Sequence, residues 1–322
     1  MGDLTGGSYM VWSAMPATYQ LPTHWPAAYD PAAAGRLIER FAELGRTETR
    51  LAQRPAVRAM LSALGGNSPY LSDLAVREPA ALRALVTHGP QRVVDDALAM
   101  LSALPIHSRR DQVMAALRRA KRVTALATAV ADLGGLWRLE QVTAALSDLA
   151  EAALTRAVAF LLRAAHDAGE LRLPEPANPG PGGGFTVLGM GKLGARELNY
   201  SSDIDLVLLY DPAAPLYTER TEGDAKAGFA ARLARALVSL METRDADGYV
   251  FRTDLRLRPD PAATPPAVAI TNAITYYESM GLNWERAAMI KARPVAGDLA
   301  LGTAFLEAIR PFIWRRGLDF SA

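Results

Sequence analysis

The 322-residue sequence has no cysteine, very few histidines and almost no excess charge, with a net charge of +1. The absence of cysteine excludes disulfide bonds and thiolate metal sites, and it is compatible with the cytoplasm. The near balance of charge favours neither nucleic acid nor a membrane surface as a partner. A histidine metal site is not expected either, because the four histidines are scattered: His24, His88, His107 and His166.

Long apolar runs are absent as well. A membrane-spanning helix needs about 18 or more apolar residues, and no stretch of that length is free of charge. The N-terminus lacks a basic region followed by an apolar one, so we expect no signal peptide and a cytoplasmic location. Half of the residues are apolar and 21% are charged, which is typical of a globular protein long enough for two or more domains.

The first half of the chain is rich in alanine, leucine and arginine, which favour helices. Apolar residues at 139, 142, 146, 149 and 153 are spaced by three and four, as on a helix with one buried face. Turn residues interrupt this region at 65–69, 79, 89–90, 105 and 134–135. The sequence therefore predicts a helical region over residues 1–172, built from about six to eight helices.

A different pattern begins after a segment rich in proline and glycine at 173–184, which we interpret as a linker. Apolar strands are predicted at 185–188 and 204–210, a helix at 224–244, and an alternating strand at 249–258. We expect a catalytic core over 185–270 with a mixed β-sheet, followed by C-terminal helices over 271–322 that end as a truncated piece of a longer protein. The predicted fold class is α+β, preceded by an all-α region.

Two aspartates, Asp203 and Asp205, stand at the head of the second predicted strand. Side chains at i and i+2 share one face of a strand, and two adjacent carboxylates repel each other unless a cation lies between them. With a nearby phosphate they form a Mg²⁺ site. Asp254, on the polar face of the alternating strand, is the expected third ligand. This constellation predicts a nucleotidyltransferase with two Mg²⁺ ions, for which Mn²⁺ can substitute.

The turn before these acids is rich in glycine. Gly189, Gly191 and Gly194 match the dinucleotide-binding pattern, but only about eight residues could be helical before Ser202, too few for its crossover helix. We expect instead that the backbone amides of Gly189 and Gly191 approach a nucleotide phosphate. Lys192 is predicted either to bind phosphate or to be merely exposed.

Other polar groups near the acids have two interpretations each. Ser202 could contact the same phosphate or cap a turn. Arg256 and Arg258 share the predicted face of Asp254, where they could hold an anionic substrate or form salt bridges. Trp284 and the adjacent tyrosines Tyr276 and Tyr277 are expected in the core.

Three segments resemble the bifunctional glutamine synthetase adenylyltransferase/adenylyl-removing enzyme family: 189–206 (GMGKLGARELNYSSDIDL), 250–259 (VFRTDLRLRP) and 284–293 (WERAAMIKAR). Residues 66–71 and 133–137 are similar to its helical region. The first segment resembles the N-terminal, adenylyl-removing half of the family more than the transferase half. Met190 stands where the wider superfamily has serine, which leaves backbone amides to bind phosphate there.

The resemblance implies phosphorolysis: inorganic phosphate removes AMP from an adenylylated tyrosine of glutamine synthetase and gives ADP. It implies that Asp203 and Asp205 hold both metal ions, that Asp254 holds one, and that Lys192, Arg256 or Arg258 binds phosphate. Glutamine synthetase, adenine nucleotides and a PII-type signalling protein are the implied partners. Two alternatives remain open: adenylyl transfer from ATP, and a non-catalytic module that docks glutamine synthetase or the regulator.

Overall fold

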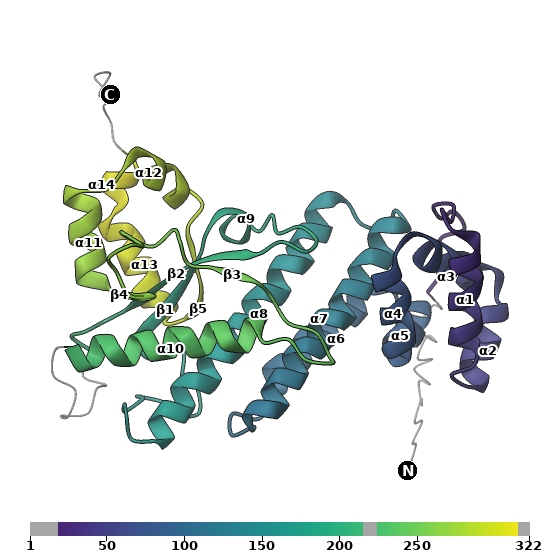
Figure 1. The fold of residues 1–322 in the computed structure, drawn as a ribbon, viewed down its shortest axis with the longest axis horizontal. Coiled ribbons are helices and arrows are strands. Elements are labelled where there is room, and N and C mark those ends of the chain that lie inside the picture. The colour runs from purple at the N-terminus through teal and green to yellow at the C-terminus, as the bar shows by residue number, and fades with distance from the viewer. Residues whose placement is uncertain (1–18, 215–223, 315–322) are drawn as a thin grey trace, which may run out of the picture.

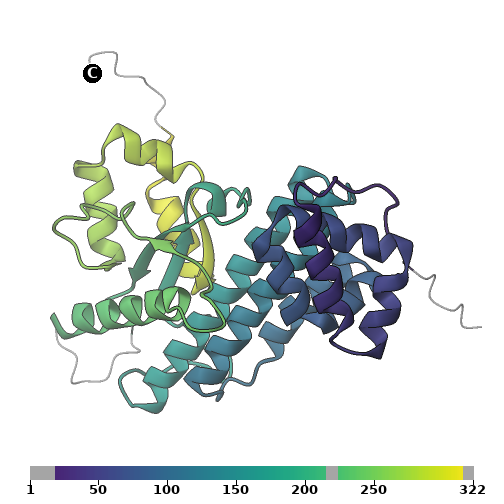
Figure 2. The ribbon, with the colours of Figure 1, turned by 45° about the vertical axis from the view of Figure 1, so that its right-hand side comes forward.

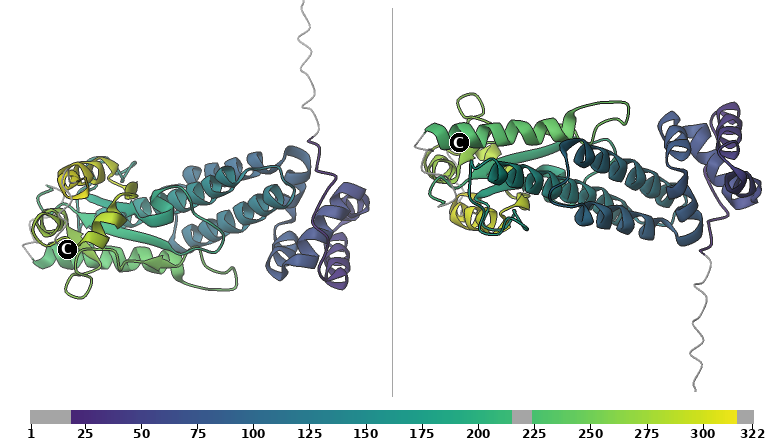
Figure 3. Two further views of the ribbon diagram at one scale, coloured as in Figure 1. Left: turned by 90° about the horizontal axis from the view of Figure 1, so that it is seen from above. Right: turned by 90° about the horizontal axis from the view of Figure 1, so that it is seen from below.

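The computed structural model describes residues 19–214 and 224–314, which form an elongated molecule. Figure 1 shows short N-terminal helices at one end and a β-sheet flanked by helices at the other. The views from above and below in Figure 3 show long helices that run between these two ends. The helical region is thus placed beside the sheet rather than wrapped around it.

Proline and glycine divide the first half into helices, as the sequence predicts. Pro69, Pro79 and Pro90 each begin a helix, because proline's fixed φ suits the first turn and its missing amide hydrogen is not needed there. Within the described residues the helices before the sheet are α1 (Pro31–Ala42), α2 (Arg46–Gln53), α3 (Pro55–Asn67), α4 (Pro69–Arg77), α5 (Pro79–His88), α6 (Pro90–Ala103), α7 (Arg110–Leu133) and α8 (Leu139–Asp167).

The two longest helices, α7 and α8, connect the helical region to the sheet (Figure 2). At 1.5 Å per residue, the 29 residues of α8 extend about 44 Å. The predicted apolar stripe of α8 is buried except for Leu139, which is 72% exposed at the first position of the helix. One continuous hydrophobic cluster includes α7, α8, the sheet and α10 (Asp224–Glu242). The segment 173–184 has no helix or strand, and the regions on either side of it share this core.

The sheet is mixed, which confirms the predicted α+β class. Its five strands are β1 (Phe185–Gly189), β2 (Ile204–Tyr210), β3 (Thr253–Asp254), β4 (Ala267–Ala269) and β5 (Arg293–Gly297). β1 lies between β5 and β2 and is antiparallel to both. β3 and β4 pair with successive parts of β2 in the parallel direction. The start of β2, where the acids lie, is therefore next to β3.

Alternating side chains of β2 enter two different cores. Leu206 and Leu208 pack with α8 and α10, whereas Val207 and Leu209 pack against the helices on the opposite face. Those helices are α11 (Ile270–Ser279), α12 (Asn283–Met289), α13 (Leu299–Ala308) and α14 (Arg310–Ile313). Because side chains alternate along a strand, Asp205 lies on the face of Val207 and Leu209.

Several expectations for the second half were wrong. The strand predicted over 249–258 forms only at Thr253–Asp254. The amides of Val250 and Phe251 both donate to the carbonyl of Met241 at the end of α10, so they are not available to a sheet, and both side chains are buried.

Two short strands escaped prediction. β4 has only three residues. β5 contains Pro294, and a proline in a sequence argues against predicting a strand there. Pro294 is tolerated because β5 is an edge strand with a register irregularity beside that residue. Trp284, expected in the core, is 50% exposed, whereas Tyr277 is buried as predicted. Within the described ranges no helix is long and apolar enough to cross a membrane.

Candidate active site

The glycine-rich turn connects β1 to β2 in close contact with the acids. The Met190 amide donates to the Asp205 carbonyl over 2.9 Å. Gly191 has a φ of 50°, and a Cβ atom there would lie 3.1 Å from Asp205 Oδ2. At Gly194 a Cβ would lie 1.9 Å from the carbonyl oxygen of Lys291, so that residue must be glycine for packing. The turn therefore needs glycine to bring backbone next to Asp205.

The dinucleotide interpretation of these glycines does not fit the structure. The helix after the turn, α9 (Gly191–Gly194), has only four residues. β1 and β2 are antiparallel, whereas the dinucleotide motif joins parallel strands through a full helix. The glycines serve a tight turn between antiparallel strands instead.

The carboxylates of Asp205 and Asp254 are neighbours across the sheet. The parallel register pairs Asp205 with Asp254, and Asp203 precedes β2 by one residue. Burial raises the pKa of Asp205, and the carboxylates of Asp254 and Asp203 raise it further. Arg256 and Lys192 act in the opposite direction on that pKa. The neighbouring carboxylates and partial burial thus make the negatively charged form of Asp205 less favourable.

Arg256 neutralises part of this charge. Its Nε lies 3.0 Å and 2.8 Å from the two carboxylate oxygens of Asp254, and its backbone amide donates to Oδ1 over 2.8 Å. These hydrogen bonds, the side-chain one foremost, lower the pKa of Asp254. The Asp254 side chain is 14% exposed and that of Arg256 is 85% exposed, so the guanidinium covers the carboxylate from the solvent side.

The donor set fits a hard divalent cation in its chemistry. All three candidate ligands are carboxylates, the donors that Mg²⁺ and Mn²⁺ prefer, and two of them share one register position. In the described part of the chain, however, no three carboxylate or imidazole side chains converge on one point. We attribute this lack of convergence to the ion pair between Asp254 and Arg256, because the Asp254 carboxylate faces that arginine. A bound cation would have to take the place of Arg256 on Asp254.

The predicted phosphate-binding side chains have other partners in this structure. Lys192 Nζ donates to Asn199 Oδ1 over 3.3 Å, and the Ser202 hydroxyl donates to the same oxygen. Both thereby brace the turn that leads to Asp203. Arg258 Nη1 and Nη2 each lie 2.8 Å from a backbone carbonyl, those of Leu255 and Pro261. Its Nε lies 3.1 Å from a third carbonyl, that of Pro265, so Arg258 holds the loop after β3.

Two residues that the sequence analysis did not include among the predicted site residues, Asn199 and Arg252, support the site. Asn199 accepts both hydrogen bonds just described. Arg252 links the acidic strands: its Nη2 donates to the Ser201 carbonyl over 2.7 Å, and its own carbonyl accepts from the Ile204 amide over 2.9 Å. The sequence signal for these residues was their place in the segments 189–206 and 250–259, which also carry the predicted acids.

A mixed sheet with a glycine turn and paired aspartates at the start of adjacent strands defines a nucleotidyltransferase-type fold. Residues 58–308 match the glutamate-ammonia ligase adenylyltransferase family, and the chain belongs to that family.

Curated relatives agree with this assignment. The chain is 47% identical over 282 residues to the bifunctional glutamine synthetase adenylyltransferase/adenylyl-removing enzyme of Xanthobacter autotrophicus, with 87% of this chain and 28% of the relative covered. It is 44% identical over 313 residues to the protein of that name from Mesorhizobium japonicum, covering 97% of this chain and 31% of the relative. The Rhizobium meliloti relative is 49% identical over 265 residues, covering 79% and 26%. The chain thus spans less than a third of the length of these relatives.

Proposed function

We propose that this chain removes AMP from an adenylylated tyrosine of glutamine synthetase by phosphorolysis. The observation that carries the proposal is the pairing of Asp205 with Asp254 beside the glycine turn, in a chain of this family. The segment from Asn199 to Asp205 resembles the removing half of the family more than the transferring half, which favours removal over adenylyl transfer from ATP.

In this reaction an oxygen of inorganic phosphate forms a bond to the phosphorus of AMP, and the bond from that phosphorus to the tyrosyl oxygen breaks. The products are ADP and a free tyrosine hydroxyl, which takes its proton from solvent. Phosphate is already an anion, so the reaction needs no dedicated general base. What the protein must supply is positioning and neutralisation of charge.

The residues divide this work in our proposal. Asp203, Asp205 and Asp254 would hold two Mg²⁺ ions, which when bound neutralise and orient phosphate oxygens. Gly189 and Gly191 let backbone amides approach the nucleotide phosphate. Arg256, which is exposed and which a cation on Asp254 would displace, would then be free to hold the incoming phosphate with Lys192. Arg258 would act by holding the loop that follows Asp254.

The test is to incubate the chain with adenylylated glutamine synthetase, Mg²⁺ and phosphate, and to assay ADP. A parallel reaction with ATP and unmodified glutamine synthetase, assayed for pyrophosphate, tests transfer. ADP formation that requires phosphate supports removal, and pyrophosphate formation supports transfer. If neither product forms, the proposal fails, and the alternative of a non-catalytic docking module for glutamine synthetase or a PII-type regulator is favoured.

A further inference from the structure

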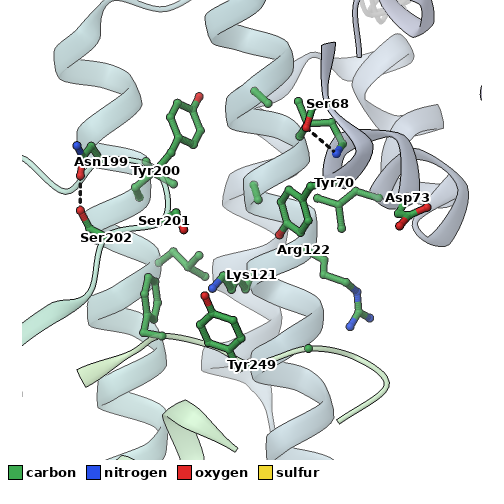
Figure 4. Close-up of a pocket in the computed structure, with 18 of the residues that line it drawn as sticks. Ser68, Tyr70, Asp73, Lys121, Arg122, Asn199, Tyr200, Ser201, Ser202 and Tyr249 are labelled. Atoms are coloured by element: carbon green, nitrogen blue, oxygen red, sulfur yellow. Dashed lines mark hydrogen bonds between the residues drawn. The ribbon is translucent and has the colours of Figure 1, made fainter. Parts of the chain in front are cut away.

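A pocket of about 690 Å³ lies behind the acidic site, between the helical region and the sheet. Its walls are α4, α7 and α8, the turn at 198–202 and the loop at 244–251 (Figure 4). Sites for small organic ligands commonly have volumes of about 300–1,000 Å³. The pocket is therefore large enough for a metabolite, and no step of the proposed reaction uses it.

The inner surface of the pocket is mainly apolar, and its charged lining residues include both cations and carboxylates. The lining carboxylates have partners: Asp73 pairs with Arg40, Asp247 pairs with Arg77 and Arg122, and Asp132 accepts from the Tyr200 hydroxyl. The apolar lining comes from both regions of the protein: Leu71, Leu74, Leu146, Leu149, Leu198 and Phe251. Lys121 and Arg244 line it as well. Figure 4 shows Lys121 reaching from α7 toward Tyr249, with Tyr70 from α4 nearby and Tyr200 on the other side of the pocket. A ligand with an apolar part and a negatively charged part would match this distribution.

Lys121, which is partly buried, and Arg244, which is exposed, both contact the ring of Tyr249. Lys121 Nζ lies 4.2 Å from the centre of the Tyr249 ring and donates to the Val250 carbonyl. Arg244 lies 5.0 Å from the same ring. Neither forms a salt bridge with any carboxylate in the part of the chain that the structure describes. By contrast, Arg122, which also lines the pocket, forms salt bridges with Glu78 and Asp247.

The groups that act on Lys121 disfavour its positive charge. Burial lowers its pKa to about 8, and the positive charges of Arg252 and Arg244 contribute to the same shift. A lysine that is partly buried beside two arginines destabilises its own charged form. An anion between Lys121 and Arg244 would remove this cost, and the hydrogen bond to Val250 uses only one of the three ammonium hydrogens.

We propose that this pocket binds a small organic anion, a carboxylate or phosphate carried on an apolar or aromatic group. The anionic group would lie between Lys121 and Arg244, and the apolar group against Leu146 and Leu149. This proposal does not depend on the proposed function, because it rests on the cavity and on these two cations.

The pocket is connected to the acids through its walls. Ser202, which lines it, is adjacent to Asp203, and Phe251 precedes β3 by two residues. The hydrogen bonds of Arg252 join these two segments. A ligand that fixes both walls would therefore restrain the starts of β2 and β3, and cation binding at the acids should respond to it.

Calorimetric titration of the full chain without divalent cation tests the binding. The probes are phenyl phosphate and phenylacetate, with inorganic phosphate and uncharged phenylacetamide as controls. The first two distinguish a phosphate site from a carboxylate site. We expect one of these aryl anions to bind with a stoichiometry of one, and both controls to bind at least about tenfold more weakly, because each lacks half of the recognised chemistry.

Variants locate the binding. Lys121→Met and Arg244→Met should each weaken it about tenfold or more, Lys121→Arg should retain most of it, and exposed Arg58→Met should leave it unchanged. Circular dichroism checks that each variant is folded. Absence of binding by both aryl anions, equal binding by Lys121→Met, or equal binding of inorganic phosphate would overturn the proposal. Mn²⁺ affinity that does not change with the anion bound would overturn the coupling to the acids.

Discussion

Replacing Asp205 with asparagine should make the protein more stable when no metal is bound. It should also reduce the stabilisation that added metal provides. Neighbouring strands are about 4.8 Å apart, and like charges at that spacing repel by about 1 to 3 kcal/mol near a protein surface. Because Asp205 is only partly buried, we take the lower end, about 1 kcal/mol, as the expected gain in the free energy of unfolding at pH 7. Urea unfolding of both proteins without divalent cation measures this difference.

The raised pKa of Asp205 determines how the stability difference between the two proteins should change with pH. Burial and neighbouring carboxylates raise the pKa of Asp205 in the folded state. Its contribution to stability is therefore fully present below the ordinary value of 3.8 and is lost as the pH rises through the raised pKa. The advantage of the asparagine variant should accordingly be largest at neutral pH and should vanish in acid.

Added Mn²⁺ should reverse the order of stability. A cation at one hundred times its dissociation constant stabilises the folded state by about 2.7 kcal/mol, and Asp205→Asn should lose most of that gain. Asp95→Asn, an exposed substitution on α6, is the matched control and should behave as wild type. If Asp205→Asn were no more stable without metal and kept the full response to Mn²⁺, the reasoning about this site would be refuted.

Three further outcomes follow from the same geometry. Asp254→Asn should slow the chemical step about 100-fold or more in single-turnover assays while the fold stays intact, and near wild-type turnover would assign the third ligand elsewhere. Arg256→Ala should raise the Michaelis constant for phosphate more than that for the protein substrate. Arg258→Ala should instead lower the free energy of unfolding in urea by about 1–3 kcal/mol, because it leaves loop carbonyls without a donor. The reverse pattern would exchange the roles of the two arginines. As the pH rises from about 8 to 10.5, wild type should gain about 2–3 kcal/mol of stability relative to Lys121→Met, since the folded state favours neutral Lys121, and a constant difference would contradict its lowered pKa.

Local sequence signals predicted those parts of the fold that depend on local chemistry. Proline fixed the starts of α4, α5 and α6, and a near-continuous apolar run from Ile204 to Tyr210, interrupted by Asp205, predicted β2 at its observed bounds. Both features are determined by a few consecutive residues. Asp203 lies one residue before β2, so the expectation that it shares a strand face with Asp205 stays a prediction.

The parts that sequence could not predict depend on distant partners. β5 exists because β1 offers it an edge, although Pro294 argues against a strand. The amides of Val250 and Phe251 cap α10 instead of joining the sheet, since Met241 lies within reach only after the chain folds. In the candidate site, Asp254 was expected on a strand near Asp205, but neither their parallel register nor the attachment of Arg256 to Asp254 was predicted.

The most direct test of the account uses adenylylated glutamine synthetase and inorganic phosphate labelled with ³²P. Phosphorolysis at the paired aspartates predicts that the label enters the β-phosphate of ADP, with one ADP formed for each tyrosine released. It also predicts that Asp205→Asn lowers this rate about 100-fold or more while Asp95→Asn does not. Release of unlabelled AMP without phosphate, or full activity of Asp205→Asn, would contradict the account.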